Sequence, residues 1–65
     1  MNKVNGARAF LRAKYGVYRE VDVYRRGEHL YVPHGKGFLR IMQMWAGKWA
    51  TSHPQVDVIE LEGVS

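Results

Sequence analysis

The chain has 65 residues, no cysteine, 12% aromatic residues and a formal net charge of +4. These values exclude a disulfide-stapled scaffold and a thiolate zinc site, and no apolar run approaches the roughly 20 residues of a membrane-spanning helix. A domain of this size buries only about 60% of its unfolded surface, so dense aromatic packing or self-association must supplement a small core. We expect one cytoplasmic domain over residues 1–65, with neither cofactor nor metal.

Positive charge is distributed unevenly along the chain. Residues 1–48 hold all ten Lys and Arg side chains and three of the six acidic ones, whereas residues 49–65 hold the other three acids. Such asymmetry predicts a cationic face that attracts phosphates or an acidic protein surface. The alternative is an ordinary solvated surface on a basic protein.

Residues 5–15 are predicted to form a helix. Asn5 suits the N-cap position and Gly16 suits the C′ position. Arg8 and Arg12 lie one turn apart, beside the buried stripe of this helix. The apolar residues at i, i+3, i+4 spacing that would make this stripe are Val4, Ala7, Leu11 and Tyr15.

From residue 17 the apolar period changes to two, which predicts strands. The sequence Arg-Arg-Gly-Glu at 25–28 is expected to turn the chain between the first two strands. One helix followed by four or five short antiparallel strands predicts an α+β domain, with the N-terminal helix packed on a small antiparallel sheet or SH3-like barrel. The predicted strands cover about residues 17–25, 29–32, 38–46, 49–52 and 56–62.

The segment 38–46 has two interpretations. As a strand it presents apolar side chains on both faces, which suits a small and strongly curved barrel. The sequence Ala-Gly-Lys that follows resembles a hairpin turn, which favours the strand. As a helix the segment would have a stripe of Phe38, Ile41, Met42 and Trp45.

The positions of Trp45 and Trp49 depend on this turn. A two-residue turn at Gly47–Lys48 would put one tryptophan in the core and leave the other exposed, as a stacking platform or a protein hot spot. A three-residue loop would let both pack. Glycine in the first central position favours the two-residue turn, and the alternative is that both tryptophans are core residues.

Cations interleave with aromatic residues over most of the chain, a combination typical of nucleic-acid-binding modules. We therefore expect a small basic accessory protein that binds DNA or RNA, mostly through phosphates. The alternative is a compact inhibitor or adaptor, of the kind common on phages and mobile elements, that binds an acidic protein. Self-association is compatible with either function. The candidate binding residues are Arg8, Arg12, Lys14, Arg25, Arg26, Lys36, Arg40 and Lys48, with Tyr31, Trp45 and Trp49 for stacking or as hot spots.

No catalytic set is expected, because the three histidines lack metal-ligand spacing and no serine has triad partners. One fragment, Arg-Gly-Glu-His-Leu-Tyr-Val-Pro-His-Gly-Lys at 26–36, resembles the strand region of HicA-type toxins. These are small dsRNA-binding-like ribonucleases in which a histidine follows a Gly-Ser pair, before a Val-Pro-His stretch. The resemblance implies a ribonuclease in which His29 is catalytic, although Glu28 stands where the family has serine.

Overall fold

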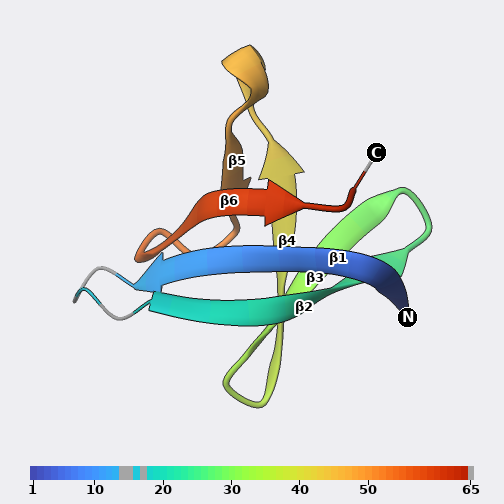
Figure 1. Cartoon of the computed structure of the whole chain (residues 1–65). Helices are drawn as coiled ribbons and strands as arrows, with labels where there is room; N and C mark the ends of the chain where they lie inside the picture. Colours follow the sequence, from blue (N-terminus) through green and yellow to red (C-terminus); the bar gives the residue numbers. More distant parts are fainter. Residues whose placement is uncertain (14–15, 17, 65) are drawn as a thin grey trace.

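The chain folds into a closed barrel of six antiparallel strands (Figure 1). The computed structural model describes residues 1–13, 16 and 18–64. Each strand pairs with the next one along the chain, and β6 closes the barrel by pairing with β1. The strands are β1 (Asn2–Ala13), β2 (Tyr18–Arg26), β3 (His29–His34), β4 (Gly37–Gln43), β5 (Trp49–Thr51) and β6 (Val56–Glu62), and a 3-10 turn, η1, covers Trp45–Gly47.

The predicted α+β fold with a helix over residues 5–15 is wrong, because residues 5–13 lie in β1. Ala7, Ala9 and Leu11 are buried there, and the residues between them point outward. A short helix is only marginally stable in water, whereas the strand gains backbone partners on both edges, from β2 and from β6. The protein is therefore an all-β, six-stranded barrel, and not a helix on a sheet or an SH3-like barrel of four to five strands.

The later strands lie close to where the alternating pattern predicts them. Residues 38–46 do not form an α-helix: residues 38–43 belong to β4, and Trp45 and Ala46 belong to the 3-10 turn η1. The strand predicted over 17–25 corresponds to β2, which begins at Tyr18. Val17 lies outside the described residues, as do Lys14, Tyr15 and Ser65. Among the described residues, no helix has the length and hydropathy needed to cross a membrane.

The core is small and aliphatic. Val23 and Val32 are the largest side chains that are completely enclosed, and no described polar side chain is buried. Trp49 packs partly buried against this core, which adds aromatic area to it. The buried residues are Ala7, Ala9, Leu11, Val21, Val23, Leu30, Val32, Ile41 and Val56.

The barrel is least regular between β5 and β6. Among the described residues these strands are in register only at Ala50 and Asp57. Figure 1 shows β4 and β5 running steeply across β6, with the connection between them projecting from the barrel. Beyond Asp57, this edge of β6 is therefore not paired with a strand in the part of the chain that the structure describes.

Candidate nucleic-acid interface

A row of four side chains crosses the outer face of β1, β2, β3 and β4. Lys3 is in register with Tyr24, Tyr24 with Tyr31, and Tyr31 with Arg40. We call these four residues the outer row. It places two aromatic rings between two cations, over a span of about 14 Å at the usual strand spacing. The sequence neighbours that point inward from β2, β3 and β4, and thereby fix the row on the outside, are Val23, Leu30, Val32 and Ile41.

Phe38 extends the aromatic surface of the row. Its ring lies edge-on to Tyr24, with centroids 5.2 Å apart and an interplanar angle of 73°. Phe38 is 48% exposed, so this packing leaves about half of its surface free for a ligand. Such an edge-to-face contact also fixes the orientation of both rings. The barrel thus presents three aromatic side chains on adjoining strands, two of them packed against each other.

Cations frame these rings. Arg26 lies two residues after Tyr24 on β2, hence on the same outer face, and is in register with the exposed His29. No ion pair joins Arg26 or Arg40 to a carboxylate within the described residues. Their positive charge is therefore available to an anionic ligand. We call the outer row together with Arg26 and Phe38 the aromatic–cationic face.

Acidic residues moderate the charge at one end of this face. Asp22 lies 3.7 Å from the ammonium of Lys3 and also accepts a hydrogen bond from the guanidinium of Arg8. Glu20 pairs with the same Arg8 at 3.3 Å. These groups are partly exposed, so the pairs contribute little to stability. Their main effect is electrostatic: Asp22 partly neutralises Lys3, whereas Arg26 and Arg40 keep their full charge.

The barrel divides the cations that the sequence singles out. Arg26 and Arg40 share the aromatic–cationic face, but Arg8 and Arg12 lie on β1, not on a helix, and are held in ion pairs, Arg12 with Asp57 at 3.6 Å. Lys14 lies outside the described residues. The other three cations lie apart from one another. Arg25 lines a hollow together with Leu30, Gln43 and Val64. Lys36 lies in the turn between β3 and β4, and Lys48 lies between η1 and β5.

The three predicted stacking residues also separate. Tyr31 is in the centre of the outer row. Trp45 is 88% exposed in η1, whereas Trp49 is partly buried against the core. One tryptophan is thus exposed and the other is packed. The turn, however, is longer than the predicted two-residue turn: the Met44 amide donates a hydrogen bond to the Lys48 carbonyl, and this bond closes the loop between β4 and β5.

The three histidines lie in two separate places. His34 and His53 lie near each other, with ring centroids 5.3 Å apart, and His53 Nδ1 accepts a hydrogen bond from the amide of Gln55. His29 is exposed on another part of β3, where the HicA resemblance would place a catalytic group. Within the described parts of the chain, no three His, Cys, Asp or Glu side chains are grouped to hold a metal ion.

Sequence reasoning left Lys3, Tyr24 and Phe38 outside the predicted site. The pairing of Tyr24 with Tyr31 could have been found, because a two-residue turn at Gly27–Glu28 fixes the register of β2 and β3. The position of Phe38 beside Tyr24 cannot be predicted without the register of a third strand, β4. The position of Lys3 cannot be predicted unless residues 2–13 are known to form a strand. Comparisons with protein-family models, with curated proteins and with solved structures find no match to this chain.

Proposed function

We propose that this protein binds single-stranded nucleic acid on its aromatic–cationic face. The supporting observation is the outer row, in which Tyr24 and Tyr31 lie side by side between Lys3 and Arg40. Aromatic rings stack on unpaired bases, and flanking cations neutralise the phosphates between them. A duplex offers no free base faces, so single strands of DNA or RNA suit this surface better.

The aromatic side chains have a different role from the cations. Stacking is sequence-tolerant, because every base has a flat face, and it is worth about 1–3 kcal/mol per base. Ion pairing to phosphates releases counterions, so it makes affinity depend on salt, with a slope of about −0.7 per contact for single strands. This proposed role is binding; it needs no catalytic group.

The test is the affinity of the protein for a labelled single-stranded oligonucleotide across a salt series. Tyr31→Ala is expected to weaken binding about 5- to 150-fold with little change in the salt slope. Arg40→Ala is expected to weaken binding and to reduce the slope by about 0.7. Arg19→Ala, which removes the same charge farther along β2, provides the matched control.

Two results would contradict the proposal. One is the absence of binding to single-stranded DNA and RNA at low salt. The other is an equal effect of Arg19→Ala and Arg40→Ala together with no effect of Tyr31→Ala, because that pattern would mean non-specific attraction to a basic protein. A competition with duplex of the same length separates single-strand binding from general phosphate binding.

A further inference from the structure

The connection between β4 and β5 holds a tryptophan out in solvent. Trp45 is 88% exposed, and no residue of η1 is buried. Ala46 has a φ of 66°, in the left-handed region that a residue with a Cβ rarely adopts, and Gly47 follows with a φ of 76°. A hydrogen bond of 2.6 Å from the Met44 amide to the Lys48 carbonyl closes this tip. A strained and closed loop that exposes a large ring suggests a binding role.

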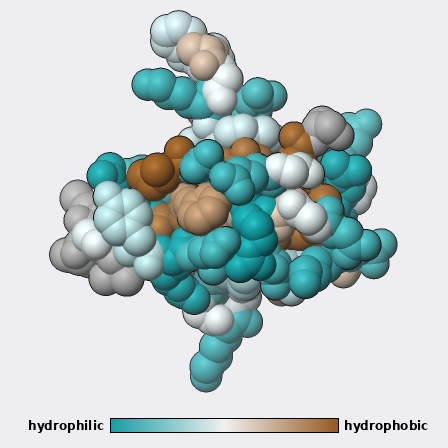
Figure 2. Space-filling model, in the orientation of Figure 1, coloured by the Kyte–Doolittle hydropathy of each residue, from teal (hydrophilic) through white to brown (hydrophobic). Residues whose placement is uncertain are grey.

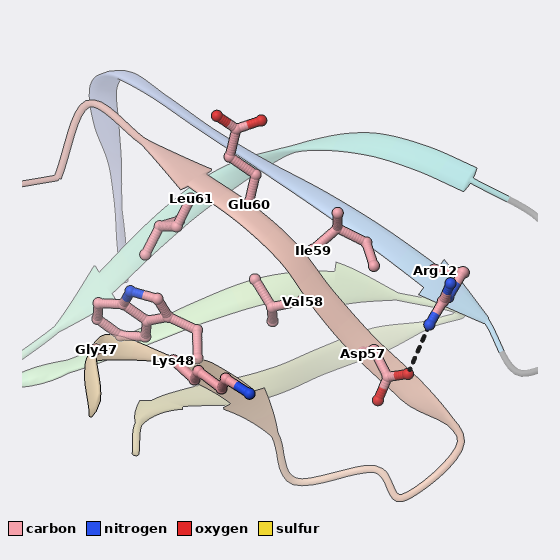
Figure 3. A pocket seen from close by; sticks show the side chains of 9 residues that line it. Arg12, Gly47, Lys48, Asp57, Val58, Ile59, Glu60 and Leu61 are labelled. Carbon is pink, nitrogen blue, oxygen red and sulfur yellow. Dashed lines mark ion pairs between the residues drawn. The ribbon is translucent and has the colours of Figure 1, made fainter. Parts of the chain in front are cut away.

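A groove of about 680 Å³ lies beside this tip. Val58 and Leu61 point into it from β6 in Figure 3, and Trp49 also lines it. The groove lies where β6 loses its pairing with β5, because among the described residues the two strands are in register only at Ala50 and Asp57. On the face seen in Figure 2, hydrophobic side chains lie in separate patches with hydrophilic ones between them. The groove therefore offers a partner both apolar side chains and charged ones, the charged ones being Arg12, Lys48, Asp57 and Glu60.

We propose that the occupant of this groove is the Trp45 tip of a second copy of the chain. Gly47 and Lys48 belong to the projecting connection and also line the groove. Tip and groove are therefore neighbours within one molecule. A two-fold axis that brings one tip into the opposite groove must bring the other tip into the first groove as well, which makes a closed dimer with two identical contacts.

The charges of the tip (residues 44–48) and of the groove are complementary. Lys48 lies beside the tip and Glu60 at the groove, and within the described residues neither makes an ion pair. Glu60 points away from the groove walls in Figure 3, so a cation that arrives from outside can reach it. In the dimer, Lys48 of each copy meets Glu60 of the other. The ion pair of Arg12 with Asp57 already balances the remaining charges that line the groove.

The exposed area agrees with a dimer. The chain exposes 4794 Å², whereas a monomer of 7.5 kDa is expected to expose about 4,250 Å². The excess of about 550 Å² is below the roughly 800 Å² that one partner contributes to a standard interface and fits only a small one. This size predicts a weak dimer, formed in the micromolar to millimolar range.

Sedimentation equilibrium of nucleic-acid-free protein over that concentration range tests the proposal. The average mass is expected to rise with concentration toward twice the monomer mass of 7.5 kDa. Trp45→Ala is expected to weaken the dimer at least about 30-fold, while its circular dichroism stays that of the folded protein. Tyr18→Ala removes another exposed ring, on β2. Tyr18 is in register with the groove residue Arg12 but does not itself line the groove, so this variant is expected to leave the dimer unchanged.

Charge reversal tests the arrangement itself. Lys48→Glu and Glu60→Lys are each expected to weaken the dimer, and the double variant to restore it. A protein that stays monomeric at millimolar concentration would overturn the proposal. A dimer that Trp45→Ala leaves intact would also overturn it, and so would a double variant as weak as the single ones.

Discussion

Gly63 lies directly against the backbone of Gly6, where the end of β6 reaches the start of β1. A Cβ atom on Gly63 would overlap the carbonyl oxygen of Gly6 and lie 3.1 Å from the Cα of Ala7. Gly63 also has a φ of 73°. This position therefore requires glycine for two reasons, and the closing pair of strands depends on it.

Gly63→Ala is expected to lower the free energy of unfolding by about 3 kcal/mol, from the left-handed backbone and from the overlap with Gly6. Gly6→Ala is the matched control, because Gly6 also has a positive φ but open space where its Cβ would be. It is expected to cost only about 1 kcal/mol. Urea denaturation of both variants gives the comparison, and equal losses would mean that the close approach does not matter.

The two tryptophans are expected to differ in their effect on stability. Trp49→Ala removes a ring that packs partly buried against the core, so it is expected to cost about 2–3 kcal/mol. Trp45→Ala removes a ring that is 88% exposed and is expected to change stability by less than about 0.5 kcal/mol. Thermal or urea unfolding of monomeric protein, at concentrations below dimer formation, is the measurement. A large loss for Trp45→Ala would show that the tip packs on its own barrel.

The sequence predicts the later strands better than the first one, for a physical reason. Residues 7–13 carry two patterns at once, because Ala7, Ala9 and Leu11 repeat with period two while Ala7 and Leu11 also fit a helix. Local propensity cannot decide between them. The strand is selected by pairing with β6, at the other end of the chain, and no local signal shows that partner.

The candidate site shows the same limit. Tyr31 could be chosen as an aromatic among cations, but its grouping with Tyr24 and Arg40 depends on the register of three strands. The ion pairs of Arg8 could not be predicted, because a helix would not place Arg8 beside Asp22, as the pairing of β1 with β2 does. The sequence thus indicates which types of residue the site uses, but not which of them lie next to one another, because neighbours across a sheet are set by strand pairing.

Asp22 is expected to limit the affinity of the aromatic–cationic face for nucleic acid. Asp22→Asn removes the charge that lies between Lys3 and Arg8, so single-strand affinity is expected to rise severalfold at low salt and the salt slope to steepen by up to about 0.7. Stability is expected to change by less than about 1 kcal/mol, since these pairs are partly exposed. The control is Asp57→Asn, which changes the net charge equally but lies beside Arg12 at the groove. Equal gains from both variants would mean that net charge alone sets the affinity.

Thr51 ties the loop between β5 and β6 through its hydroxyl. Thr51 Oγ1 lies 2.8 Å from the carbonyl oxygens of both His53 and Val56, and it accepts a hydrogen bond of 3.0 Å from the His53 amide. A hydroxyl has one proton, so it donates to one carbonyl at a time while it accepts from the amide. Because β5 and β6 are in register at only one position, this side chain supplies much of the polar contact across the seam.

Thr51→Val keeps the shape of the side chain but removes all of these hydrogen bonds, so it is expected to cost about 1–2 kcal/mol. Thr51→Ser keeps the hydroxyl and is expected to retain most of the stability. Urea denaturation measures the difference. Amide hydrogen exchange shows where in the barrel stability is lost, because in Thr51→Val the amides of His53 and Val56 are expected to lose protection before those of the rest of the barrel. If Thr51→Ser were as unstable as Thr51→Val, the methyl group would matter as much as the hydroxyl, and the hydrogen bonds would not be the main link between β5 and β6.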